Sequence, residues 1–123
     1  MARLFIQEND QDTVDILCIA LEMEDFETLA VIGYDADFVG LIKSYRPHLV
    51  MLDYKLSGLE CRDLGQLIRW HFPELPQLAM SCTNTLQETF KRYGFDAFIA
   101  KPFDLNCLYQ LLKSIINKKE VYE

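Results

Sequence analysis

Short apolar runs alternate with longer amphipathic segments along this chain of 123 residues. The runs are predicted strands, and they cover residues 4–7, 26–32, 48–52, 76–80 and 98–100. Between and after them, apolar residues recur three and four positions apart, as Val14, Leu17 and Leu21 do, which indicates helices. The predicted helices cover about residues 12–24, 35–45, 61–71, 85–93 and 104 onward. This alternation predicts an α/β domain in which helices cover both faces of a parallel sheet.

Capping residues and helix breakers mark the ends of these helices. Short polar side chains that accept a bond from the first helical turn are favoured at the N-cap. The predicted N-caps of the second, fourth and fifth helices are Asp35, either Thr83 or Thr85, and Asp104. The predicted stops of the second, third and fourth helices are Arg46-Pro47, Pro73 and Gly94.

Polar side chains follow four of the five predicted strands. They are Glu8 and Asn9 after the first, Asp53 after the third, Ser81 after the fourth and Lys101 after the fifth. In an open parallel sheet, ligands bind in the crevice outside the carboxyl ends of the strands. A carboxylate and an ammonium at the ends of buried strands are costly unless they pair. We therefore expect these side chains to line one acidic crevice, with the Lys101 ammonium near the Asp53 carboxylate.

Composition narrows the classes of function. The chain carries 12 Lys and Arg against 19 Asp and Glu, a net charge of -7 that argues against direct nucleic-acid binding. Its length fits one domain over residues 1–123, and it contains no apolar run near the roughly 18 residues that a membrane span needs. Four cysteines, at positions 18, 61, 82 and 107, lack C-x-x-C spacing. Three of the four fall among apolar neighbours, and we expect reduced core thiols in a cytoplasmic protein.

This order of residues resembles the receiver domain of two-component response regulators, in particular the stand-alone, chemotaxis-regulator-like kind. The most specific segments are RPHLVMLD at residues 46–53, LSGLE at 56–60 and GFDAFIAKPF at 94–103. The resemblance covers essentially the whole chain. It implies a flavodoxin-like, doubly wound fold with five parallel strands in the order 2-1-3-4-5 and five helices.

The resemblance also implies a role for each residue at the strand ends. Asp53 would be the phosphoacceptor. The implied ligands of Mg²⁺ are Glu8 through its water shell, Asn9, Asp53 and the backbone carbonyl of Lys55. Lys101 and the Ser81 hydroxyl would contact the phosphoryl group, and Ser81 and Phe98 would form the switch. Such a protein is a signalling phosphoacceptor that catalyses only its own phosphoryl transfer and hydrolysis.

Asn9 departs from the family pattern, because the family usually has two adjacent carboxylates at the positions that Glu8 and Asn9 occupy in this chain. A neutral oxygen there is expected to weaken Mg²⁺ binding by about 1–3 kcal/mol. Cys61 and Cys82 also stand where the family prefers smaller residues. These departures favour one alternative, a receiver-like interaction module that binds partners without phosphorylation. A flavin carrier is disfavoured because residues 7–12 are acidic and lack a glycine- and hydroxyl-rich phosphate loop.

The partners that the resemblance implies are proteins. A histidine kinase or phosphotransfer protein would supply the phosphoryl group, and a downstream protein would read the phosphorylated state. We expect neither nucleic-acid contact nor membrane insertion. The sequence leaves open whether the chain forms a homodimer.

Overall fold

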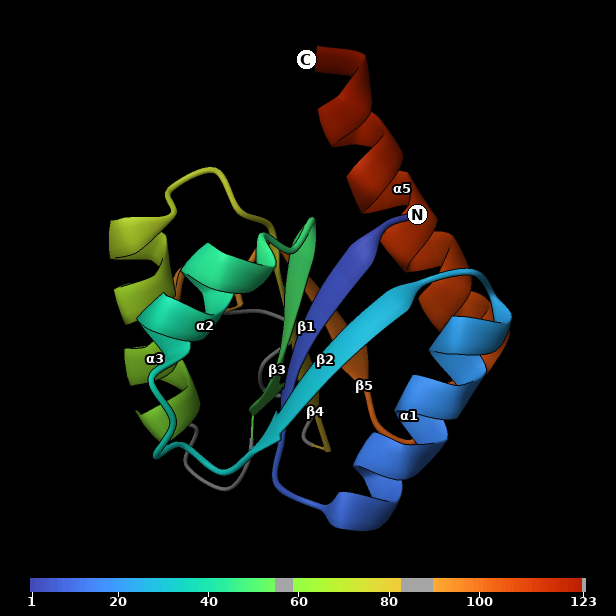
Figure 1. Cartoon of the computed structure of the whole chain (residues 1–123), viewed down its shortest axis with the longest axis horizontal. Coiled ribbons are helices and arrows are strands. Elements are labelled where there is room, and N and C mark those ends of the chain that lie inside the picture. The colour runs from blue at the N-terminus through green and yellow to red at the C-terminus, as the bar shows by residue number, and fades with distance from the viewer. Residues whose placement is uncertain (55–58, 83–89, 123) are drawn as a thin grey trace.

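Five parallel strands form one sheet in the order β2-β1-β3-β4-β5 in the computed structural model, which describes residues 1–54, 59–82 and 90–122. The strands are β1 (Arg3–Glu8), β2 (Glu27–Ile32), β3 (Leu49–Tyr54), β4 (Gln77–Ser81) and β5 (Ala97–Ala100). Figure 1 shows the sheet between two layers of helices. The predicted strands and their order are confirmed.

The described residues contain four helices rather than the five predicted. They are α1 (Gln11–Met23), α2 (Phe38–Tyr45), α3 (Leu59–His71) and α5 (Leu105–Tyr122), with labels as in Figure 1. The predicted helix over residues 85–93 lies mostly outside the described residues, as do Thr83 and Thr85. Its described end forms turns, in which the Gly94 N–H donates to the Lys91 carbonyl at 3.1 Å. Gly94 has a φ of 93°, which favours glycine and ends the turn before β5.

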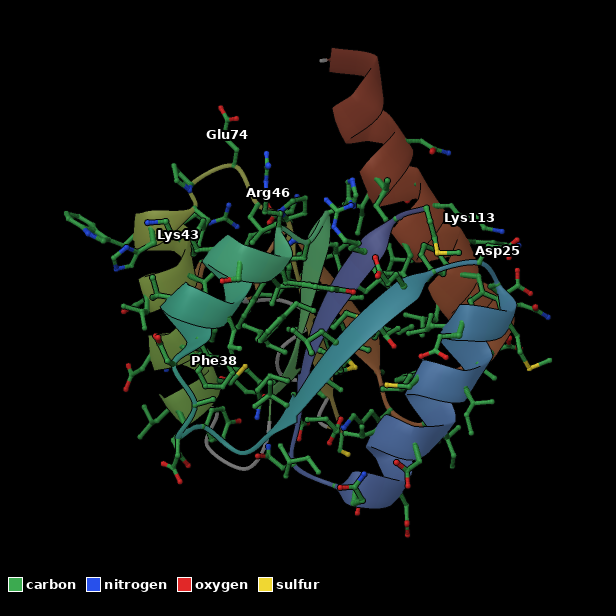
Figure 2. The ribbon with its side chains drawn as sticks, in the orientation of Figure 1. Asp25, Phe38, Lys43, Arg46, Glu74 and Lys113 are labelled. Carbon is green, nitrogen blue, oxygen red and sulfur yellow. The ribbon has the colours of Figure 1, made fainter. Side chains whose placement is uncertain are left out.

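Each face of the sheet has its own hydrophobic core. Leu4 and Ile6 point toward α1 and α5, whereas Phe5 between them packs with Phe38 on the side of α2 and α3. Figure 2 shows Phe38 on this second side and Lys113 on the first. Because β1, β3 and β4 are buried on both faces, their sequences are nearly continuous apolar runs.

The second helix begins two residues later than predicted. Its N-cap is Asp37, whose Oδ1 accepts the Gly40 N–H at 3.1 Å, and not Asp35. The segment before it brings the Tyr34 hydroxyl to the Asp53 backbone carbonyl at 2.9 Å, which delays the helix. The predicted stop is confirmed, since Arg46 is a left-handed C-cap with a φ of 56°.

Burial of the cysteines was only partly predicted. Cys61 is buried and Cys18 is half-buried, but Cys82 and Cys107 are exposed. Burial raises the pKa of the Cys61 thiol to about 12, so this thiol is protonated at neutral pH. None of the helices in the described residues has the length and hydropathy that crossing a bilayer requires.

The N-cap of α2 gives a test of fold stability. Asp37→Ala should lower the free energy of unfolding by about 1 kcal/mol, because the Gly40 N–H loses its acceptor. Asp35→Ala, in the exposed segment before the helix, is the matched control and should change it by less than about 0.5 kcal/mol. Urea unfolding of both variants measures the difference. Equal losses would contradict the assignment of the cap.

Candidate functional site

The carboxyl ends of the strands bring the predicted residues to one edge of the sheet, at the bottom of Figure 1. Asp53 is the next-to-last residue of β3, and Tyr54 after it pairs in register with Ser81 on β4. The Lys101 N–H donates to the Ser81 carbonyl at 2.7 Å, which extends the ladder one residue beyond β5. Figure 2 shows Arg46 and Glu74 at the opposite edge.

Lys101 bridges two buried carboxylates. Its Nζ lies 2.8 Å from Glu8 Oε2 and 3.0 Å from Asp53 Oδ1. The side chains of Lys101, Glu8 and Asp53 are 17%, 2% and 6% exposed. The predicted proximity of Lys101 and Asp53 is therefore observed, and Glu8 shares the same cation.

Asn9 satisfies the other oxygen of each carboxylate. Its backbone N–H donates to Glu8 Oε1 at 3.0 Å, and its side-chain Nδ2 donates to Asp53 Oδ2 at 2.7 Å. Each of the four carboxylate oxygens thus accepts a hydrogen bond. The sequence suggested that Asn9 offers an oxygen to a metal, but here its amide nitrogen faces Asp53.

Gln7 and Tyr34 also contact Asp53, and neither contact was predicted from the sequence. Gln7 Oε1 accepts the Asp53 backbone N–H at 3.2 Å, and the Tyr34 hydroxyl donates to the Asp53 carbonyl at 2.9 Å. A fully buried glutamine inside an apolar strand is a signal that could have identified Gln7. Tyr34 follows Gly33 in a loop, where its sequence carries no such signal.

The two predicted switch residues lie on neighbouring strands. Ser81 is fully buried at the end of β4. Phe98 is half-buried on β5 and stacks on Phe90 at a centroid distance of 6.3 Å. Lys55, the remaining predicted metal ligand, lies outside the described residues.

The electrostatics of the site keep Asp53 ionised. Burial alone would raise the pKa of Asp53, but its contact with Glu8, the hydrogen bonds from Lys101 and Asn9 and the Lys101 charge hold it below its usual range. Burial raises the pKa of Glu8, and its contact with Lys101 only partly opposes this. The two carboxylates hold the pKa of Lys101 above its usual value despite burial. At neutral pH the site presents an ionised Asp53 beside a protonated lysine.

The donor set fits a weak magnesium site of two carboxylates. Glu8 and Asp53 offer hard oxygen donors that meet at one cation, which is the chemistry Mg²⁺ prefers. The described residues contain no group of three or more His, Cys, Asp or Glu side chains that could hold a metal. The Asn9 amide does not supply the third oxygen in this arrangement.

Removing the shared cation should destabilise the fold in a pH-dependent way. Lys101→Met leaves two buried carboxylates without a counter-charge, and we expect a loss of about 2 kcal/mol at neutral pH. Without Lys101, the folded-state pKa of Glu8 should rise further above its ordinary value of 4.5. A raised folded-state pKa gives stability that is present at low pH and lost as the pH rises through it. The deficit should therefore shrink as the pH falls from about 7.5 to about 5.

Lys113→Met is the matched control for this test. Lys113 lies 3.8 Å from Glu24 in a pair whose side chains are both largely exposed, and such pairs contribute little. Urea unfolding at several pH values measures both variants. A pH-independent deficit in Lys101→Met would contradict the role assigned to the shared cation.

Comparison with known proteins agrees with this geometry. The family model of the response regulator receiver domain matches residues 4–113. The chain is 26% identical over 119 residues to the DNA-binding response regulator MtrA of Mycolicibacterium smegmatis, covering 96% of this chain and 52% of that protein. It is 29% identical over 102 residues to MtrA of Mycobacterium tuberculosis, covering 82% of this chain and 44% of that protein. The chain therefore spans about half the length of the curated relatives it matches.

Solved structures share the fold. A two-component response regulator from Clostridium difficile matches with a TM-score of 0.85 and 24% identity, covering 97% of this chain and 98% of that one. NtrX from Brucella abortus matches with a TM-score of 0.86 and 26% identity, covering 98% of this chain and 28% of that one. Chemotaxis protein CheY4 of Vibrio cholerae matches with a TM-score of 0.81 and 13% identity, covering 94% of this chain and 98% of that one. With the family match over most of its length, this chain belongs to the response regulator receiver domains of two-component systems.

Proposed function

We propose that this receiver accepts a phosphoryl group on Asp53 and passes the signal on by protein contact. The observation that carries the proposal is the buried Asp53 carboxylate, which Lys101 contacts at 3.0 Å at the carboxyl end of β3. A carboxylate oxygen of Asp53 would attack the phosphorus of a phosphohistidine or small acyl phosphate. A phosphorus–oxygen bond to Asp53 forms as the bond to the leaving group breaks, and the leaving group keeps that electron pair.

The neighbouring side chains support this step by charge and position. Lys101 is close enough to Asp53 to neutralise an oxygen of the incoming phosphoryl group. Mg²⁺, when bound, would be held weakly by Glu8 and Asp53 together with the Lys55 carbonyl, and would supply further charge neutralisation. The Ser81 hydroxyl, at the end of the adjacent strand, would bond another phosphoryl oxygen. The chain would catalyse no reaction beyond its own phosphorylation and dephosphorylation.

The partners we propose are a histidine kinase or phosphotransfer protein upstream and a protein downstream. The net charge of -7 disfavours nucleic acid as a direct ligand of this domain. The readout surface we propose consists of the turn over residues 90–94, β5 with Phe98, and the exposed face of α5. We place this exchange in the cytoplasm.

Asn9 keeps a second function open, that of an interaction module independent of phosphorylation. Its amide occupies the Asp53 oxygen that Lys101 leaves free, so that Asp53 is satisfied without a ligand. A module of this kind would bind its partner equally well before and after exposure to a phosphodonor.

Intact-mass measurement separates these two functions. Incubation with a small acyl phosphate and Mg²⁺ should add the mass of one phosphoryl group to the wild-type chain and none to Asp53→Asn. Asp12→Asn, which removes an exposed carboxylate in the first turn of α1, is the control and should be modified like the wild type. A mass that never changes would favour the phosphorylation-independent module.

Ser81→Ala tests the conformational response. The variant should still be phosphorylated, because Asp53 and Lys101 are intact. The response should weaken, because a modification shifts an equilibrium only through its different interactions with the two states. NMR shift changes on phosphorylation, followed across β5 and α5, measure this. Changes that persist undiminished in Ser81→Ala would rule out the coupling.

A further inference from the structure

The backbone fixes the orientation of the Gln7 amide. The Asp53 N–H can only donate, so the atom of Gln7 that faces it at 3.2 Å must be Oε1. The Gly33 carbonyl can only accept, so the atom that faces it at 2.9 Å must be Nε2. Gln7 is fully buried, and reversing its amide would set donor against donor and acceptor against acceptor.

Gln7 in turn constrains one side of Asn9. Its Nε2 donates to Asn9 Oδ1 at 3.3 Å. The amide oxygen of Asn9 is therefore directed toward Gln7, which leaves the amide nitrogen to face Asp53.

Tyr34 constrains the other side. Its hydroxyl proton is used by the Asp53 carbonyl at 2.9 Å, so the hydroxyl oxygen can offer only lone pairs to Asn9. Asn9 Nδ2 lies 3.3 Å from this oxygen and 2.7 Å from Asp53 Oδ2. Both protons of the Asn9 amide therefore have acceptors, and its oxygen has a donor.

We propose that Gln7 and Tyr34 are positioning residues that hold Asn9 as a hydrogen-bond donor to the Asp53 carboxylate, and that Asn9 is not a ligand of a metal. This inference rests on the proposed function, in which Asp53 is the phosphoacceptor. Flipping the amide to present its oxygen would break three hydrogen bonds and set Oδ1 against the Asp53 carboxylate. The chain thus uses the position of the family's second acid to orient Asp53 with a neutral donor.

Magnesium affinity separates a donor from a ligand. Asn9→Ala should bind Mg²⁺ within about threefold of the wild type, whereas loss of a true ligand should weaken binding roughly tenfold or more. Asn9→Asp is the positive control and should tighten binding by roughly one to two decades, because it adds a charged oxygen. NMR titration with Mg²⁺ at fixed pH and ionic strength measures all three chains. A tenfold loss in Asn9→Ala would overturn the proposal.

Phosphorylation by a small acyl phosphate at saturating Mg²⁺ tests the orienting role. Tyr34→Phe should lower the phosphorylation rate at saturating phosphodonor roughly tenfold, because Asn9 is no longer held as a hydrogen-bond donor to the Asp53 carboxylate. The half-saturating concentration of phosphodonor should not change. Asn9→Ala should show the same pattern. Wild-type rates in both variants would overturn the proposal.

Tyr45→Phe is the matched control. Tyr45 is also partly buried on the side of α2 and α3, but its hydroxyl has no hydrogen-bond partner among the described residues. Burial raises the pKa of both tyrosines to about 12, so each loses a neutral hydroxyl. Tyr45→Phe should leave both the Mg²⁺ affinity and the phosphorylation rate at the wild-type values.

One spectroscopic signal decides the inference even in a chain that accepts no phosphoryl group. The Asn9 side-chain amide should give one proton resonance displaced downfield by its short bond to Asp53, and Tyr34→Phe should shift the other proton. An Asn9 amide with the shifts of a solvent-exposed asparagine would overturn the proposal. A displaced resonance in a chain that is never phosphorylated would keep the donor assignment and reject only the proposed function.

Discussion

The Lys101 ammonium makes it possible to bury two carboxylates at one edge of the sheet. Two unit charges about 4 Å apart interact by about 4 kcal/mol at an effective dielectric of 20, so Glu8 and Asp53 would repel strongly without a shared cation. Lys101 follows β5, whereas its partners lie on β1 and β3. Neighbouring strands are about 4.8 Å apart, so a long side chain must reach past the end of β4. The strand order and this one ion pair therefore depend on each other.

The rest of the site completes what the ion pair leaves open. Lys101 satisfies one oxygen of each carboxylate, and Asn9 satisfies the other two. A second acid at Asn9 would face Asp53 with a like charge in place of a donor. Exchanging that acid for an amide removes a repulsion, and the amide then needs neighbours that fix its direction. Gln7 and Tyr34 are those neighbours, and each is itself anchored to backbone.

Prediction from sequence worked where a feature depends on local pattern. The strands could be predicted because β1, β3 and β4 are buried on both faces, and the meeting of Asp53 with Lys101 followed from parallel strands ending at one edge. The start of α2 could not be predicted, because Asp35 and Asp37 are equivalent capping signals in the sequence. The hydrogen bond of Tyr34 to the Asp53 carbonyl, a tertiary contact, decides between them.

Contacts between strands of the sheet could not be predicted from the sequence either. Gln7 reaches Asp53 because β1 and β3 pair so that Gln7 lies beside Leu52, a register that no local pattern specifies. Core burial was expected for most of the cysteines, but Cys107 is exposed one position away from the buried Leu108 in α5. On a helix one position is a rotation of about 100°, which is enough to leave the core.

If Asp53 carries a phosphoryl group as proposed, the charge on that side chain changes from -1 to about -2. The charge of the Glu8, Asp53 and Lys101 cluster then falls from -1 to about -2, and a divalent cation neutralises the modified cluster but overcompensates the unmodified one. Mg²⁺ should thus bind the phosphorylated form more tightly, and by reciprocity it favours that form by the same factor.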